Sequence, residues 1–566
     1  MFDYVIVGGG SAGCVMANRL SAGGEFKVCL LEAGPPDDSP FIPMPGGVLA
    51  LLRSKVYNWQ FWTLPQPRMG NRPLFWPRGR TLGGSSSINA QVCIRGHAWD
   101  YDRWAELGNE GWAWRDVLPL FKALENYEPG ADEAGGLLPG MEAFHGRGGP
   151  LNVASLRDTN PMSQVFVDAA RQAGHAPNDD FNGATQEGVG FYKVYQKDGQ
   201  RCSNARAYLR EAQKRPNLTV ITHAQATRVV FDHGRAAGVR YVYGGKEHEV
   251  AAKREVILSA GTVGSPQLLL LSGIGPAVEL ARHGIAQQHE LPGVGQNLQD
   301  HLDAYVVMRA KTRLGMSFHP SSLLRTIKAL LQYLFGRRGP LTSNIAEAGG
   351  FARSHPAEPV PDLQFHFAPL VNVRHGLDLW PAFRWYGHTL MTCDLRPLSR
   401  GELRLASADP LAPPAIDPKH FEQERDLDKL VTGLKKAREI FAQPAFAPHN
   451  LEEMEPGPAV RSDAEIREWI RGHAETLYHP VGTCKMGSDP MAVVDARLRV
   501  HGVTGLRVVD ASIMPTLVGG NTNGPSTMIG ERGARLVLED IARAQAESAG
   551  KASGAAAPEA MAEAVE

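Results

Sequence analysis

The sequence predicts a mixed α/β protein, α+β overall, that begins with a parallel sheet and adds a second unit built on an antiparallel sheet. Residues 2–7 have the apolar run of a buried strand, a glycine-rich turn follows at 8–13, and a helical pattern continues to Leu20. Apolar and polar residues alternate at 363–367 and 388–393, as in antiparallel strands. A chain of 566 residues is long enough for about two to four such units.

The first unit has the pattern of a Rossmann-like, dinucleotide-binding fold. In its G-x-G-x-x-G turn, Gly8 permits the tight turn, Gly10 lets a pyrophosphate approach the backbone, and Gly13 lets the helix pack closely on the strand. The helix N-terminus offers free N–H groups and partial positive charge to phosphates. A second apolar strand at 28–31 ends in Glu32, which can accept hydrogen bonds from an adenosine ribose. This unit alone does not separate NAD from FAD.

Composition excludes several classes of function. Lys and Arg number 59 against 60 Asp and Glu, so the net charge of −1 gives no electrostatic reason to expect nucleic acid. The six cysteines form no C-x-x-C or Cys/His spacing, so we expect reduced thiols and no metal site. No signal peptide and no apolar stretch of about 18 residues is present, so we expect a cytoplasmic protein. Residues 546–566 are rich in Ala, Glu, Gly and Ser, and we expect a disordered tail there.

A second glycine-rich segment, residues 79–89, reads G-R-T-L-G-G-S-S-S-I-N. Its glycines and serines provide a flexible backbone and many hydrogen-bond donors, which suit the wrapping of a polar cofactor. An ordinary surface loop would have the same composition, so this segment alone leaves both interpretations open.

Four later segments identify a family when they are read together with residues 2–32 and 79–89. They are G-T-V-G-S-P through S-G-I-G at 261–275, Y-H-P-V-G-T-C-K-M-G at 478–487, V-V-D-A-S-I-M-P at 508–515 and N-T-N-G-P at 521–525. With these blocks in this order, the chain resembles the glucose–methanol–choline (GMC) oxidoreductases, and among them the bacterial FAD-dependent aliphatic alcohol dehydrogenases and the choline dehydrogenases. The resemblance covers nearly the whole chain.

The resemblance implies FAD rather than NAD, and it implies two interleaved domains. The expected FAD-binding domain comprises 1–155, 215–305 and 475–545, and the expected substrate-binding domain comprises 156–214 and 306–474. The strand-like stretches 255–259 and 507–509 fit returns of the chain to the parallel sheet of the FAD domain.

Two departures from the family pattern concern the serine-rich segment. Members that attach FAD covalently use a His in this segment, and here that position is Ile88, so we expect non-covalent FAD. Cys93 stands where the family usually has an aromatic residue or Ala, which would reshape the loop without undoing it.

The resemblance implies that His479 is the catalytic base and that Asn523 is its partner, placed to hydrogen-bond the substrate oxygen. Alcohol oxidation needs a base for the hydroxyl proton and an acceptor for the hydride, which would be flavin N5. Imidazole suits the first task because its ordinary pKa of about 6.5 leaves it largely neutral at working pH. Asn521 has the weaker claim, because in a turn rich in Asn and Gly its amide can simply satisfy backbone groups.

The remaining expected site residues are those that would contact FAD. They are Gly8, Gly10, Ser11, Ala12, Gly13, Glu32, Ala33, Arg80, Leu82, Gly83, Gly84, Asn89, Ala226, Asp510, Ala511, Asn521 and Thr522. Asp510 resembles a contact to the ribityl chain, and it also has the sequence context of a helix N-cap.

The substrate is harder to predict than the reaction. Choline would need a carboxylate and an aromatic cage. Glu347 resembles the carboxylate of choline-oxidising members, but residues 344–346 supply no aromatic wall. The aromatic cluster at 380–386 could supply a cage or could belong to the core. We therefore expect an aliphatic alcohol, with choline as the alternative. A quinone-type electron acceptor is favoured by the resemblance, and an oxygen-using alcohol oxidase stays open.

The segment 321–338 has apolar residues at helical spacing, with Arg and Lys off that stripe. Either the helix packs its stripe on its own domain, or it docks on a membrane near the active-site mouth. Peripheral association with the cytoplasmic face of an inner membrane is therefore left open.

Two other classes of function are weighed against the oxidoreductase. Residues 9–13 also satisfy G-x-S-x-G, the nucleophile elbow of α/β-hydrolases, but that elbow follows several strands and an oxyanion loop for which there is no room here. A flavoprotein that only binds its cofactor would not need the pair His479 and Asn523.

Overall fold

The computed structural model describes residues 1–128 and 140–555. Its first sheet has a parallel core in the order β10-β2-β1-β13, with β24 on the far side of β13. These strands are β1 (Phe2–Val7), β2 (Val28–Leu31), β10 (Leu218–Ile221), β13 (Lys246–Leu258) and β24 (Leu506–Val508). The expected returns of the chain at 255–259 and 507–509 are thus confirmed as β13 and β24, and the predicted Rossmann-like arrangement is present.

Strand β13 joins the parallel part of the first sheet to an antiparallel part. Its first half pairs antiparallel with β12 (Arg235–Tyr243), which in turn pairs with β11 (Gln225–Asp232). Its second half, from Ala252 onward, pairs parallel with β1. The central strands β1 and β2 are almost entirely buried because helices cover the sheet, which explains their uninterrupted apolar sequence.

The second sheet is antiparallel throughout and runs β22-β16-β19-β18-β17-β7, with β23 beside β16. The strands are β7 (Gly188–Phe191), β16 (Leu302–Ala310), β17 (Ala348–Ala352), β18 (Leu363–Ala368), β19 (Gly387–Asp394), β22 (Asn450–Glu455) and β23 (Glu475–Thr476). Along β18 the side chains alternate: Phe365 and Phe367 join a hydrophobic core, while His366 faces a cavity. The antiparallel strands expected at 363–367 and 388–393 are confirmed.

Two features bear on the expected division into domains. The short strand β23 lies in the range expected for the FAD domain but pairs with β16 of the antiparallel sheet, and β16 itself crosses the expected border at residue 305. The domain limits stay a prediction.

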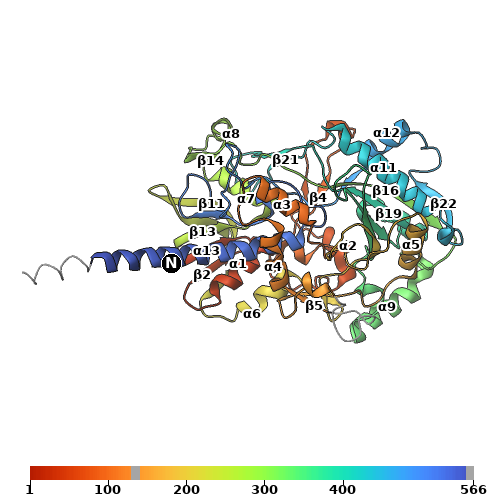
Figure 1. The fold of residues 1–566 in the computed structure, drawn as a ribbon, viewed down its shortest axis with the longest axis horizontal. Helices are drawn as coiled ribbons and strands as arrows, with labels where there is room; N and C mark the ends of the chain where they lie inside the picture. The colour runs from red at the N-terminus through yellow and green to blue at the C-terminus, as the bar shows by residue number, and fades with distance from the viewer. Residues whose placement is uncertain (129–139, 556–566) are drawn as a thin grey trace, which may run out of the picture.

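Helices surround the two sheets (Figure 1). The longer ones are α1 (Ser11–Ser21), α4 (Trp114–Leu124), α5 (Pro161–Gln172), α7 (Gly261–Leu271), α9 (Leu323–Gly336), α11 (Glu424–Phe441), α12 (Asp463–His473) and α13 (Asn523–Ala555). The shorter ones are α2 (Val48–Leu52), α3 (Ala98–Glu106), α6 (Arg210–Ala212), α8 (Ala277–Arg282) and α10 (Trp380–Arg384). Helix α1 packs along α13, and α5 and α11 contact the antiparallel sheet. Within the described residues, no helix is both long enough and apolar enough to cross a membrane.

The remaining strands form small two-stranded sheets. They are β3 (Phe61–Trp62) with β4 (Phe75–Trp76), β5 (Glu125–Tyr127) with β6 (Leu151–Val153), β8 (Gln196–Lys197) with β9 (Gln200–Arg201), β14 (Ile274–Gly275) with β15 (His289–Glu290), and β20 (Glu402–Arg404) with β21 (Ala415–Asp417).

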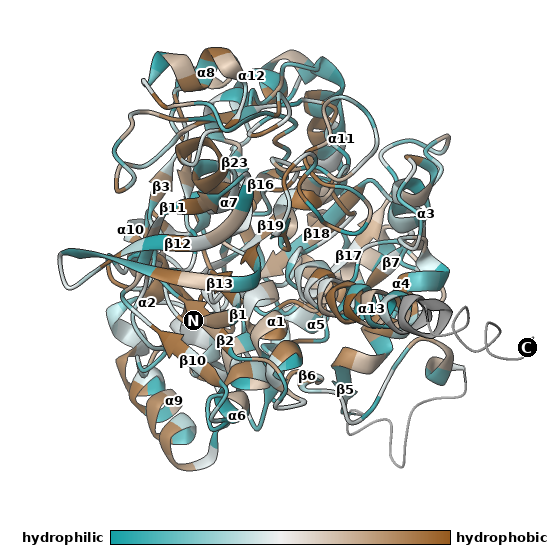
Figure 2. Ribbon diagram, turned by 90° about the vertical axis from the view of Figure 1, so that its left-hand side faces the viewer, coloured by the Kyte–Doolittle hydropathy of each residue, from teal (hydrophilic) through white to brown (hydrophobic). Residues whose placement is uncertain are grey.

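The C-terminal helix corrects one expectation. Helix α13 projects from the body of the molecule (Figures 1 and 2) and continues to Ala555, so residues 546–555 are helical rather than part of a disordered tail. Alanine and glutamate have high helix propensity, and extending an existing helix avoids the cost of nucleating a new one. The rest of the expected tail, 556–566, lies outside the described residues.

The glycine-rich turn generates the first prediction. A Cβ atom at Gly13 would lie 1.9 Å from the carbonyl oxygen of Gly8, whereas a Cβ at Gly23 would meet nothing within 4 Å. Gly13→Ala should therefore lower the free energy of unfolding by about 1–3 kcal/mol through overpacking. It should also reduce the FAD that the protein retains, while Gly23→Ala does neither. Chemical denaturation and flavin absorbance measure both effects, and equal behaviour of the two variants would contradict this packing role.

Candidate active site

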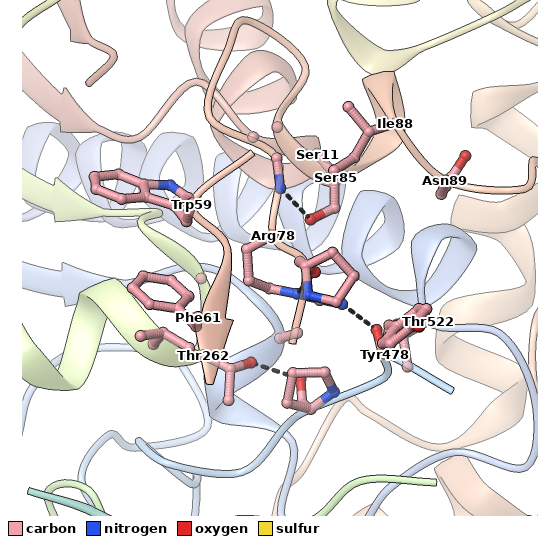
Figure 3. A pocket seen from close by; sticks show the side chains of 18 of the residues that line it. Ser11, Trp59, Phe61, Arg78, Ser85, Ile88, Asn89, Thr262, Tyr478 and Thr522 are labelled. Atoms are coloured by element: carbon pink, nitrogen blue, oxygen red, sulfur yellow. Dashed lines mark hydrogen bonds between the residues drawn. The ribbon is translucent and has the colours of Figure 1, made fainter. Parts of the chain in front are cut away.

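A cavity of about 430 Å³ lies where the parallel sheet, the serine-rich segment and the antiparallel sheet meet. Most of the expected site residues line it: Gly8, Gly10, Ser11, Ala12, Glu32, Ala33, Gly84, Asn89, Ala226, His479, Asp510, Ala511, Asn521, Thr522 and Asn523. Figure 3 shows Ser11, Ser85 and Ile88 on one side of this space and Arg78 reaching toward Tyr478. Segments that are hundreds of residues apart in sequence thus form one site.

Four expected residues stand behind the cavity wall rather than in it. Gly13 packs against Gly8, and Arg80 lies over the ring of Trp59 at 4.9 Å. Leu82 contacts Gly9, and the N–H of Gly83 donates to the carbonyl of Gly9 at 2.7 Å. These four residues shape the glycine turn and the serine-rich segment.

The glycine turn and the serine-rich segment form a cradle for a polar group. A Cβ atom at Gly84 would lie 2.7 Å from the Cα of Gly10, so the two segments touch and only glycine fits. Helix α1 begins after Gly10 with no side-chain cap and no acidic residue in its first turn. Its first N–H groups are therefore available to an anion such as a pyrophosphate.

Glu32 closes the nucleotide end of the cavity. Its carboxylate accepts the N–H of Gly9 and the N–H of Gly34, both at 2.8 Å. Burial raises the pKa of Glu32 to about 7, and the two N–H bonds act in the opposite direction. Because a carboxylate has about four acceptor positions, Glu32 can hold the glycine turn and still accept ribose hydroxyls.

Asp510 caps a short helix and also lines the cavity. It caps the short helix at Ala511–Ile513 by accepting the N–H of Ser512, and it also accepts the N–H of Gly261 at 2.9 Å. Its side chain lines the cavity as well. The capping geometry is observed, and the contact to a ribityl chain stays a prediction.

His479 is buried at the junction of the two sheets, where Asp300 fixes its backbone. One carboxylate oxygen of Asp300 accepts the backbone N–H groups of both His479, at 2.7 Å, and His301, at 2.9 Å. This shared acceptor brings the two imidazole rings together, with 3.0 Å between their Nδ1 atoms.

The hydrogen bonds around His301 determine the tautomer of His479. The Nε2 atom of His301 lies 3.1 Å from the carbonyl oxygen of Leu395, which can only accept, so Nε2 carries a proton. Burial lowers the pKa of His301 to about 3, so its Nδ1 is unprotonated and accepts a hydrogen bond. The donor must be Nδ1 of His479, which leaves Nε2 of His479 unprotonated.

A second contact supports the same tautomer. The amide nitrogen of Asn521 lies 3.3 Å from Nε2 of His479, and an amide N–H can only donate. Burial, followed by the neighbours His301, His366 and Arg78, places the pKa of His479 well below its usual 6.5. His479 therefore presents an unprotonated nitrogen to the cavity at neutral pH.

The structure exchanges the expected roles of the two asparagines. Asn521 is bonded to His479, and its amide oxygen accepts from Gln364 at 3.1 Å. Asn523, expected to be the partner of His479, instead accepts a hydrogen bond from Ser11 at 2.9 Å, beside the glycine turn. The reason is the turn itself: the two side chains are separated by one residue and point to different parts of the cavity.

Three residues of the site were not predicted from the sequence. They are His301, Gln364 and Arg78, whose guanidinium donates to the carbonyl of Tyr478 (Figure 3). Burial lowers the pKa of Arg78 to about 10, so it still carries a positive charge beside His479 at neutral pH. Arg78 directly precedes the serine-rich segment 79–89, whereas His301 and Gln364 lie outside every motif, so only the folded chain reveals these two.

The fold and the site define a dinucleotide-binding protein with a neutral imidazole in its cavity, and comparison with known proteins identifies its family. Two family models described as GMC oxidoreductase match residues 2–303 and 397–530. The chain is 50% identical to an alcohol dehydrogenase (acceptor) of Pseudomonas putida over 96% of each chain. It is 43% identical to the mitochondrial choline dehydrogenase of Mus musculus, over 95% of this chain and 89% of that protein.

A solved structure supports the same assignment. A formate oxidase of Aspergillus oryzae, described with its FAD, superimposes with a TM-score of 0.87 and 29% identity, covering 95% of this chain and 98% of the other. The chain therefore belongs to the GMC oxidoreductase family. It is an FAD-dependent oxidoreductase. Three features of the cavity fit this cofactor: the glycine turn with the serine-rich segment, the uncapped N-terminus of α1, and Glu32.

The paired imidazoles generate a prediction that tests whether His301 orients His479 or only packs against it. His301→Gln retains an acceptor for His479 and a donor for Leu395, so it should preserve most of the rate of flavin reduction by an alcohol. His301→Leu leaves the tautomer of His479 unfixed and should reduce kcat by roughly 10²-fold, with KM and FAD content little changed. Stopped-flow reduction and flavin absorbance measure these quantities. Equal rates in the Gln and Leu variants would show that His301 does not orient the base.

Proposed function

We propose that this protein oxidises a primary aliphatic alcohol to the aldehyde. The observation that carries the proposal is the unprotonated Nε2 of His479, which lies beside the amide of Asn521 in a cavity whose lining includes several apolar side chains. The apolar side chains that line this cavity include Val92, Ile345, Leu370, Met391 and Leu477. Such walls suit an alkyl chain, and the two polar groups suit its terminal hydroxyl.

The residues of the site divide the reaction between them. Nε2 of His479 accepts the hydroxyl proton, and its Nδ1–H bond to His301 keeps the ring in the reactive tautomer and orientation. The N–H of Asn521 can donate to the alcohol oxygen, while Gln364 holds that amide in place. FAD, when bound, supplies the acceptor for the hydride released from the alcohol carbon. A positioned base of this kind contributes on the order of 10²–10⁴-fold in rate.

The charges around the cavity favour an aliphatic alcohol over choline. Glu347, the candidate carboxylate for a quaternary ammonium, does not line the cavity. It is buried and accepts hydrogen bonds from the N–H of Asn160 and the hydroxyls of Ser163 and Ser343, at 2.6–2.7 Å. Among the described residues that line the cavity, the only carboxylates are Glu32 and Asp510, and both are bonded at the dinucleotide end. A cationic substrate would therefore find no counter-charge.

The aromatic cluster does not supply a cage either. Trp380 and Phe383 are 68% and 46% exposed, and neither lines the cavity. Trp385 lies under the guanidinium of Arg309 at 3.6 Å, and the hydroxyl of Tyr386 bonds to Ser321. Choline remains the second candidate because a 43% identical relative is a choline dehydrogenase.

The remaining parts of the proposal concern the cofactor linkage and the electron acceptor. Ile88 lines the cavity and is 3% exposed, and its hydrocarbon side chain offers no atom for a covalent bond to FAD. We therefore propose non-covalent FAD. We also propose a quinone-type acceptor, in line with the acceptor-linked relative from Pseudomonas putida, and a position at the cytoplasmic face of a membrane.

The proposed substrate is tested by anaerobic titration of the yellow holoprotein with 1-octanol and, separately, with choline. Octanol should bleach the flavin absorption, and choline should bleach it much more slowly. His479→Ala should keep its FAD and lose about 10²–10⁴-fold in the rate of bleaching. If choline bleached the flavin and octanol did not, choline would be the substrate. A normal rate of bleaching in His479→Ala would show that His479 is not the base. Treatment with acid or denaturant should release FAD from the protein.

The depressed pKa of His479 predicts the pH dependence. The unprotonated imidazole is the active form, so the rate is lost as pH falls through the pKa of His479. Because this pKa lies well below its usual value, flavin reduction should be nearly constant between about pH 6.5 and about pH 8. Stopped-flow rates across this range give the profile, and an acid limb with an apparent pKa at or above about 6.5 would contradict it.

A further inference from the structure

Helix α9 turns its apolar stripe toward solvent. It lies at the edge of the molecule in Figures 1 and 2, and only Ala329 and Tyr333 of the helix are buried. The exposed stripe, called here the α9 surface, consists of Leu323, Leu324, Ile327, Leu330, Leu331, Leu334 and Phe335. Leu324 is 81% exposed and Phe335 87% exposed. A contiguous apolar face of this kind marks an interaction site, so the alternative in which the stripe packs on its own domain is wrong.

The apolar stripe continues beyond the helix. Phe318, just before α9, lies against Phe383 of α10 with 5.4 Å between ring centroids, and both rings are partly exposed. Trp380 is the most exposed residue of this extension. The surface therefore spans two helices and presents aromatic as well as aliphatic side chains, as membrane-interface surfaces do.

The sequence segment that carries the α9 surface has charge of one sign. Between residues 304 and 346 the sequence contains seven Lys and Arg and no Asp or Glu: Arg309, Lys311, Arg313, Arg325, Lys328, Arg337 and Arg338. Arg309 forms a salt bridge with Glu452, and none of the other six forms one within the described part of the chain. An apolar stripe flanked by unpaired cations is complementary to a surface with an apolar interior and anionic headgroups.

The same charges argue against a second copy of the chain as the occupant. A two-fold symmetric contact places the same patch on both sides of the interface. Two α9 surfaces would then bring Lys and Arg against Lys and Arg, with no carboxylate in the segment to offset the repulsion. A bilayer that contains anionic lipid has no such conflict.

The position of α9 connects this surface to the active site. The turn Pro340–Thr342 follows α9 directly, and Leu341 of this turn packs against Gly46, which precedes α2. Leu49 of α2 and Ile345, a few residues after the turn, both line the cavity. A bilayer against α9 would thus lie beside the wall of the substrate cavity.

We propose that the α9 surface docks the protein on the face of a bilayer that contains anionic lipid, with α9 in the plane of the interface. This inference extends the proposed function by naming the surface and the partner. Its failure and the failure of the substrate assignment are distinguishable, because vesicle binding is measured without any alcohol.

The experiment is co-sedimentation of the FAD-loaded protein with vesicles of phosphatidylcholine containing roughly 30% phosphatidylglycerol. The wild-type protein should sediment with these vesicles and much less with pure phosphatidylcholine. The double variant Leu324→Asn and Phe335→Asn should bind at least about tenfold more weakly. Lys328→Gln combined with Arg338→Gln should lose the preference for anionic vesicles, and about 0.5 M NaCl should have the same effect on the wild type.

A matched control uses an exposed apolar residue on another helix. Val278 of α8 is 76% exposed, and Val278→Asn should bind vesicles like the wild type. Flavin absorbance confirms that each variant is folded. Absence of wild-type binding, or equal binding by the Leu324/Phe335 variant and the Val278 variant, would overturn the proposal. A dimer in analytical ultracentrifugation that the Leu324/Phe335 variant dissociates would assign the surface to self-association instead.

Discussion

The hydrogen bond between His301 and His479 joins the two halves of the molecule at the imidazole proposed as the catalytic base. His301 immediately precedes β16 of the antiparallel sheet, and His479 belongs to a segment that packs beside the glycine loops of the parallel sheet. Asp300 accepts the backbone N–H of both histidines, so separating the two segments would break the bond between Asp300 and His479 as well as the bond between the two rings, both in a buried site. The reactivity of the base thus depends directly on how the two sheets meet, and not only on the residues that touch the substrate.

The lining of the cavity explains how a fold that is shared by a whole family can be specific for a particular alcohol. Both carboxylates among the described residues that line the cavity, Glu32 and Asp510, are occupied by backbone N–H groups. The carboxylate of Glu347 accepts hydrogen bonds from the hydroxyls of Ser163 and Ser343, outside the cavity, so a substrate in the cavity does not meet its charge. A small change in the partners of one buried carboxylate could alter the charge that a substrate meets while the sheets remain unchanged.

Local patterns predicted the parts of the fold that short stretches of chain determine. The unit from Phe2 to Glu32 was predictable because strand, turn and helix follow one another directly, and the segment around His479 because it is a long, specific block. The roles of Asn521 and Asn523 were not, because the difference rests on Ser11 and Gln364, which are distant in sequence. The pairing of His301 with His479 likewise appears only when two remote segments meet. The orientation of α9 could not be predicted, because periodicity defines a face but not what covers it.

The order in which segments enter the structure has a consequence for biosynthesis. Strand β24, near residue 507, completes the parallel sheet beside β13, and Asn523 bonds to Ser11 across 512 residues of sequence. The cofactor site therefore remains incomplete until almost the entire chain has left the ribosome, roughly half a minute to two minutes after initiation at ordinary elongation rates. During that interval the glycine-rich N-terminal unit exists without the C-terminal segments that complete its site. Formation of the complete flavin site thus requires the C-terminal segments as well as the N-terminal unit.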